Sequence, residues 1–242
     1  MKTKTGWTAL IVAISVAGAP FCACAANSQA AKPVNNVQRL APLIFFVKSS
    51  GVSVWIEYHA TCAPSEPENI PLDLTIHNEI KGGKTDPVSA VRDLVNGDTG
   101  VSVSQIRPGL IGIKSDDVWA SVFRAKLVEL KLDNGDRYNP NDAISAGINA
   151  ADASLEALRD RPVIKFGGLA EIPSKGRPHL EASAKYATLG DLLDDVTRTF
   201  GGILVYRECA RAEGTHLFDI HFYRKDADYD YRDWPIGHTT SP

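Results

Sequence analysis

Apolar side chains recur three and four positions apart in three segments of the chain, which is the spacing that predicts helices. The three segments are residues 37–49, 86–95 and 188–200. The second segment begins with Asp86 and Pro87, and the third begins with Thr188, which Asp191 follows three positions later. Both beginnings are typical of helix starts, because a side-chain oxygen there accepts a hydrogen bond from a backbone N–H of the first turn. We therefore expect a helix over each of the three segments.

Apolar and polar side chains alternate in other segments, which is the period of a half-buried strand. Single strands are expected over residues 52–58, 72–76 and 179–185. Two hairpins are expected, one from residues 101–106 and 110–114 and the other from residues 203–207 and 217–223. Of all these strands, residues 52–58 (Val52–Tyr58) and 217–223 (Leu217–Tyr223) are the candidate edges of a sheet.

The region between the two hairpins gives a weaker pattern. The apolar residues of segment 118–132 have helical spacing, but its second half fits an extended conformation about equally well. Asp133–Asp136 predicts a turn, and Asn141 is the expected N-cap of a helix that continues to about Leu158. Val163–Phe166 predicts a short strand. The strand order of residues 118–178 is left open by the sequence.

The helix over residues 188–200 and the hairpin after it repeat, in the same order, the helix over residues 86–95 and its hairpin. Without a gap, Asp93, Gly100 and Val103 align with Asp195, Gly202 and Val205. The repeat predicts an α+β fold of two related small units, each a helix-on-sheet module of the βαββ type. The expected boundaries are residues 37–117 for the first unit and 118–226 for a linker helix region with the second unit. Residues 26–36 are expected to be disordered and residues 227–242 to be a flexible tail, because neither segment shows a period.

The first 25 residues predict an export signal. Two lysines precede an uncharged apolar run over Trp7–Gly18, and Ala23-Cys24-Ala25 supplies the small side chains that a signal peptidase requires, with cleavage between Ala25 and Ala26. An uncleaved membrane anchor and a lipoprotein modified at Cys22 or Cys24 are the alternatives. The apolar run is shorter than the about 20 residues that a membrane span needs, and Phe21 does not suit a lipobox. We therefore expect a periplasmic or secreted protein.

Export changes both the charge and the cysteine content of the chain. Removal of Lys2 and Lys4 lowers the formal net charge from −3 to −5, so the composition offers no basic surface for nucleic acid. No later segment is apolar enough to span a bilayer. Cleavage would leave two cysteines, Cys62 and Cys209, which usually pair in an oxidising compartment. The alternative is two separate thiols.

The first unit also resembles a known family. It consists of a helix that ends at Gly51, a strand, a linker, a second strand, the helix over residues 86–95, Gly100 and a hairpin. In this order of elements, residues 40–117 resemble the short N-terminal (STN-like) domain shared by secretins and TonB-dependent receptors, and residues 179–225 repeat its later half. The linker is longer and richer in proline than is usual there, and no barrel, plug or secretin channel follows. The resemblance implies an envelope module that binds other proteins, and it implies no catalytic residue.

Motifs that carry chemistry are sparse. The sequence has no Gly-x-Ser-x-Gly elbow, no Walker loop and no His-Glu-x-x-His. Among its six histidines, His216 and His221 lie an odd number of positions apart in one predicted strand, which places them on opposite faces. Asp191, Asp194 and Asp195 lie near a helix N-terminus, where carboxylates stabilise the helix without any catalytic role. The sequence thus predicts no catalytic residue, no cofactor and no metal site.

These observations favour a non-catalytic protein-interaction module of the bacterial envelope that binds unidentified envelope proteins by strand addition at a sheet edge. One alternative is an accessory subunit of a secretion or assembly machine. Another is an enzyme or small-ligand binder with its site between the two units. The candidate polar residues for such a site are His77, Glu79, Arg92, His179 and Arg207.

Overall fold

The computed structural model describes residues 36–62, 70, 72–77, 86–96, 100–118, 121–151, 176–210 and 216–227. All of them lie in the second of the two units into which the chain divides, Val34–Pro242. The predictions for the signal segment, for residues 26–35, for Val163–Phe166 and for the tail beyond residue 227 fall outside the described residues. Among the described residues, no helix combines the length and hydropathy that a bilayer span requires.

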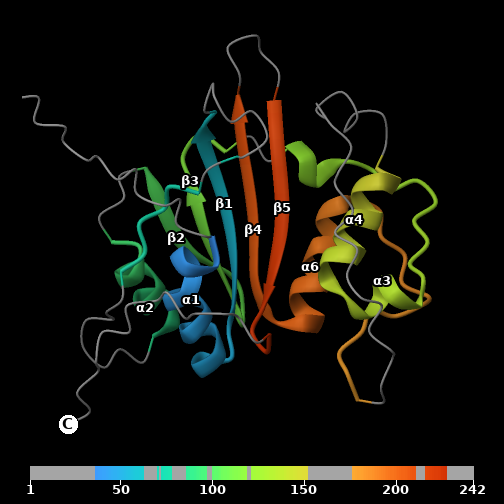
Figure 1. The fold of residues 1–242 in the computed structure, drawn as a ribbon, viewed down its shortest axis with the longest axis horizontal. Coiled ribbons are helices and arrows are strands. Elements are labelled where there is room, and N and C mark those ends of the chain that lie inside the picture. The colour runs from blue at the N-terminus through green and yellow to red at the C-terminus, as the bar shows by residue number, and fades with distance from the viewer. Residues whose placement is uncertain are drawn as a thin grey trace, which may run out of the picture. The chain divides into compact units, whose positions relative to one another are not determined.

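A five-stranded mixed sheet forms the centre of the fold, in the order β2-β3-β1-β4-β5 (Figure 1). Its strands are β1 (Ser53–Thr61), β2 (Val101–Arg107), β3 (Leu110–Ser115), β4 (Gly202–Ala210) and β5 (His216–Arg224). The middle strand β1 is parallel to β3 on one side and to β4 on the other. The edge strands β2 and β5 are antiparallel to their hairpin partners. Both predicted hairpins are confirmed, and both join the same sheet.

Helices α1 (Asn36–Ser50) and α2 (Pro87–Leu94) cover one face of the sheet. Their buried side chains pack against Val54 and Ile56 of β1. Asp86 caps α2 as predicted, since its carboxylate accepts hydrogen bonds from the backbone N–H groups of Val88 and Ser89 at 3.3 and 3.0 Å. The two helices that the sequence predicted for this part of the chain are therefore confirmed.

The opposite face is covered by α4 (Pro140–Ala150), α6 (Leu189–Phe200) and the 3₁₀ helix η1 (Ser121–Arg124). Figure 1 shows α4 and α6 on the side of the sheet away from α1 and α2. The predicted capping box of α6 is confirmed: the Thr188 N–H donates to Asp191 at 2.9 Å, and the Asp191 N–H donates to Thr188 at 3.2 Å. Gly147 lets α4 approach α6, because a Cβ at Gly147 would lie 2.3 Å from Leu192 Cδ2.

The two repeated segments form the same elements but take different places in the fold. Each is a helix followed by a hairpin, α2 with β2 and β3 and α6 with β4 and β5. The first strand of one hairpin, β2, is an edge, whereas the first strand of the other, β4, lies beside β1. The helices α2 and α6 lie on opposite faces. The α+β class is confirmed, and the two segments share one sheet instead of each building its own.

Two predicted strands are wrong. Residues 72–77 form no strand, although Leu72 and Leu74 are buried against α1 and α2. Residues 179–185 form no strand either, and Leu180 is buried with its N–H bonded to the Arg137 carbonyl of α3 (Asn134–Tyr138) at 2.9 Å. Alternating burial is also produced by irregular chain that lies along a core, so the period alone could not separate the two cases.

Three predictions for the middle region need correction or completion. Asp133 does not begin a turn but caps the short helix α3. The N-cap of α4 is Asn139 and not Asn141. The helix α4 ends at Ala150, and residues 152–158 lie outside the described residues. The open question over residues 118–132 is resolved as η1 followed by extended chain, which forms isolated bridges at Lys126 and Leu127.

Candidate functional site

The strand predicted as one sheet edge, Val52–Tyr58, lies at the centre of the sheet as part of β1, so that prediction is wrong. The second predicted edge, Leu217–Tyr223, is confirmed as part of β5. The other edge is β2, which was not among the predicted edges. An edge strand presents backbone groups that can pair with another chain, so the way each edge is protected indicates where binding can occur.

A side chain of α4 occupies the β5 edge at Phe222. The Asn141 amide donates from Nδ2 to the Phe222 carbonyl at 3.0 Å and accepts at Oδ1 from the Phe222 N–H at 2.8 Å. It therefore occupies both backbone groups of Phe222, as a neighbouring strand would. Asn139 holds Asn141 in place, because its side-chain oxygen accepts from the Asn141 N–H at 3.0 Å. Another strand could pair with Phe222 only by displacing Asn141.

The β2 edge is exposed and carries small or uncharged side chains. Ser102, Ser104 and Gln105 are exposed, and Ile106 keeps 52% of its surface accessible. The strand contains neither proline nor lysine, which are common protections of an edge. A register shift between Gln105 and Arg107 interrupts its last part. Residues 101–105 are therefore the accessible pairing segment.

Two hydrogen bonds show which backbone groups of β2 point outward. Gly100 accepts from the Asp116 N–H at 2.9 Å, so the backbone of Gly100 faces β3. The Val103 carbonyl accepts from Arg92 Nη2 of α2 at 3.4 Å, so it points away from β3. Because the direction of the backbone groups alternates along an antiparallel strand, the N–H and C=O groups of Val101, Val103 and Gln105 face outward.

Replacement of Asn141 by alanine is expected to open the β5 edge and to lower the free energy of unfolding by about 1–3 kcal/mol, because Phe222 loses both backbone partners. Asn141→Asp is the matched variant, since its carboxylate still accepts from the Phe222 N–H but has no donor for the carbonyl. Its stability should lie between those of the wild type and the alanine variant. Urea denaturation and light scattering measure stability and aggregation, and an alanine variant as stable and soluble as the wild type would show that Asn141 does not protect the edge.

A buried carboxylate lies near the end of β4. Glu208 is 2% exposed; its Oε2 accepts from the Tyr206 hydroxyl at 2.5 Å, and its Oε1 lies 3.2 Å from His59 Nδ1. Burial and the hydrogen bond to Glu208 raise the pKa of the Tyr206 hydroxyl above its usual range. The hydroxyl therefore stays protonated and acts as the donor. Both oxygens of Glu208 thus have partners, as a buried carboxylate requires. The three side chains join β1 to β4, because His59 and Glu208 are register partners on these strands.

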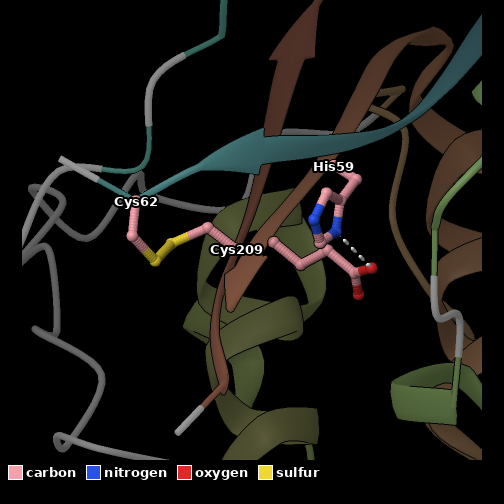
Figure 2. The surroundings of a disulfide bond; sticks show 4 residues. His59, Cys62 and Cys209 are labelled. Atoms are coloured by element: carbon pink, nitrogen blue, oxygen red, sulfur yellow. Dashed lines mark hydrogen bonds and ion pairs between the residues drawn. A yellow bond between two sulfur atoms is a disulfide. The ribbon is translucent and has the colours of Figure 1, made fainter. Parts of the chain in front are cut away.

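The predicted disulfide is confirmed. Cys62, just beyond β1, is bonded to Cys209 of β4 with a Cα–Cα distance of 5.3 Å. Figure 2 shows this bond beside the contact between His59 and Glu208, at the same end of β1. Cys209 is buried and packs with Ala60 and Ile70. The disulfide and the Glu208 contacts therefore fasten the same end of two neighbouring strands, which is a structural role.

The polar residues considered for a ligand site between the units engage separate partners, and Glu79 lies outside the described residues. The contacts of the other four are His77 with the Asn96 carbonyl, Arg92 with the Val103 carbonyl, His179 with the Arg177 carbonyl and the Tyr138 ring, and Arg207 with the Ile70 carbonyl and Asp219. None of these contacts joins two of the four residues. The described residues therefore give no evidence of a shared site.

Comparison with protein-family models, with curated proteins and with solved structures found no match. In the part of the chain that the structure describes, no group of three or more His, Cys, Asp or Glu side chains is placed to hold a metal ion. Of the two sheet edges, β2 carries the more exposed residues among those described. In the sequence, the exposure of β2 is indicated by the polar residues at positions 102, 104 and 105.

Proposed function

We propose that the protein is a non-catalytic, exported protein-interaction module of the bacterial envelope, which binds extended segments of other proteins by strand addition at β2. The contrast between the two sheet edges carries this proposal. Asn141 occupies both backbone groups of Phe222 on β5, whereas the Arg92 contact on β2 reaches only the Val103 carbonyl, and the N–H groups of Val101, Val103 and Gln105 face outward. Phe222 of β5 is thus engaged at both of its backbone groups, while β2 is less protected.

Two further observations support the export part of the proposal. The bond between Cys62 and Cys209 is of a kind that persists in oxidising compartments, such as the periplasm and the extracellular space. The first 25 residues have the composition of a signal peptide. The resemblance of residues 40–117 to the STN-like domain implies the same location and the same kind of function.

We also propose that the two helix-and-hairpin segments are related copies of one ancestral unit. They share the order helix, glycine, strand, turn and strand. The aligned glycines, Gly100 and Gly202, both have positive φ angles, of 82° and 154°. A glycine with positive φ at the start of the first strand of each hairpin supports this alignment.

Exchange of Gln105 for proline tests strand addition directly. Proline removes the outward-facing N–H of residue 105 without removing a hydrogen bond to β3, whereas Gln105→Ala removes the side chain and keeps the N–H. With a photo-reactive residue in place of Ser102, we expect cross-linked envelope proteins from the wild type and the alanine variant, and about ten-fold less product from the proline variant, since each lost backbone contact weakens binding. Equal cross-linking by the two variants would show that the backbone of β2 is not the recognition element. A product that belongs to a secretion or assembly machine would identify the protein as an accessory subunit.

A further inference from the structure

The two ends of β2 carry opposite charge. At its start, the Asp116 side chain lies beside Gly100, with Oδ2 3.6 Å from where a Cβ would be, and both Asp116 and Asp117 are exposed. The neighbouring Lys114 is paired with Glu57, at 3.1 Å. The start of the strand is therefore acidic.

The end of β2 is basic. Arg107 donates from Nε and Nη2 to Asp194 Oδ1 of α6, at 2.9 and 2.8 Å. Arg198 of α6 binds the other oxygen of Asp194, and its side chain remains 62% exposed. Two guanidinium groups thus share one carboxylate, which leaves a net positive charge at this end.

This arrangement is complementary to itself. When two antiparallel strands lie side by side, the start of each is next to the end of the other. Two β2 strands paired in this way would bring Asp116 and Asp117 of each copy toward Arg107 and Arg198 of the other. Contacts that repeat across a two-fold axis are the mark of an isologous dimer interface.

The backbone and the side chains of β2 permit such pairing. With the axis at Ser104, Val103 faces Gln105 of the second copy, and both residues turn their N–H and C=O groups outward. The exposed Arg92 side chain must leave the Val103 carbonyl, with which it makes a contact of 3.4 Å. Ser102 faces Ile106 of the second copy, so the exposed isoleucine side chain becomes partly buried.

We propose that β2 of two copies pairs antiparallel about Ser104, so that the two sheets become one continuous sheet. The proposal rests on the function proposed above, because it takes β2 as the recognition edge and names a second copy of this chain as the partner. Two strands of this length bury less surface than the about 1,200 Å² of a stable complex, so the dimer is expected to be weak and to dissociate in salt.

Cysteine cross-linking tests the register. In the full chain with Cys22→Ser and Cys24→Ser, Ser104→Cys places two thiols face to face at a non-hydrogen-bonded pair, where a Cα–Cα distance of about 4.5 Å suits a disulfide. Gln105→Cys is the matched control, because residue 105 faces residue 103 of the second copy. We expect Ser104→Cys to form disulfide-linked dimers at least about ten-fold faster than the control, since the bond requires this geometry. Equal rates would overturn the proposal.

Charge reversal tests the orientation of the two copies. Asp116→Arg and Arg198→Glu should each lower the dimer fraction in sedimentation at low salt, because each places like charges at both ends of the strand pair. A mixture of the two variants should restore dimers, since every end then carries opposite charges. Loss without restoration, or no loss, would overturn the proposal. If cross-linking to other envelope proteins still depends on the N–H of Gln105 in that case, the proposed function stands and only the choice of partner is wrong.

Discussion

Replacement of both Cys62 and Cys209 by alanine is expected to lower the free energy of unfolding by about 5 kcal/mol. The bond joins residues that are 147 positions apart, and the chain-entropy account of a cross-link predicts a loss of about this size for so long a loop. Domains of this kind have a total stability of about 5–15 kcal/mol, so the variant would be close to unfolding at 37 °C. Urea denaturation of the two proteins measures the difference.

Reduction provides the control for this experiment. Dithiothreitol should destabilise the wild type by nearly the same amount and leave the double alanine variant unchanged, because the variant has no bond to reduce. Cys209 is 2% exposed, so alanine also removes a little buried volume, and the variant should be slightly less stable than the reduced wild type. A variant within about 1 kcal/mol of the oxidised wild type would contradict the assigned role, since removal of a native disulfide typically costs more.

Replacement of Gly202 by alanine is expected to cost about 3 kcal/mol. A Cβ at this position would lie 2.2 Å from the backbone oxygen of Tyr223, and the residue has a φ of 154°, which side-chain-bearing residues rarely adopt. The oxygen belongs to β5, so it can move only if the ladder between β4 and β5 is disturbed. Overpacking and backbone strain of this kind each cost about 1–3 kcal/mol.

Gly51→Ala is the matched control, because it separates strain from steric overlap. Gly51 has a φ of 72°, but a Cβ there would meet nothing within 4 Å. Its alanine variant should therefore lose only the about 1–2 kcal/mol of the left-handed conformation. Urea denaturation of both variants measures the difference, and an alanine at position 202 that costs no more than one at position 51 would show that the close approach of Tyr223 does not matter.

Local chemistry made the predicted helices and hairpins reliable. Asp86 and Thr188 each accept a hydrogen bond inside the first turn that they cap, a contact that depends on a few neighbouring residues only. Gly100, just before β2, and Gly202, the first residue of β4, both have positive φ angles. Segments whose conformation is decided within a few residues can be recognised in a sequence, because all the interacting groups lie close together along the chain.

The sheet order could not be obtained in this way. Residues 52–58 alternate like a strand with one exposed face, yet Ser53, Val54, Trp55 and Ile56 are all buried, because α4 and α6 cover the face that carries the more polar residues. The Ser53 hydroxyl accepts from the Gly202 N–H at 3.3 Å, and Glu57 pairs with Lys114. One signal was available: the apolar run Ile203–Tyr206 is typical of a strand buried on both faces, and it forms β4 beside β1.

The candidate site depended still more on distant contacts. Asn141 is of a residue type that is common at helix caps. Only its two hydrogen bonds with the backbone of Phe222 show that it occupies the edge of β5 there. The exposed edge of β2 likewise results from the position of β3 between β2 and β1.

Capping, turn formation and burial period act over a few residues, so local sequence is enough to place α1, α2, α6 and the two hairpins and to show that two cysteines are available to pair. The central place of β1, the contact of Asn141 with Phe222 at the β5 edge and the meeting of Cys62 with Cys209 arise in the folded chain. These outcomes depend on groups that are distant along the chain and are brought together by burial of both faces of one sheet.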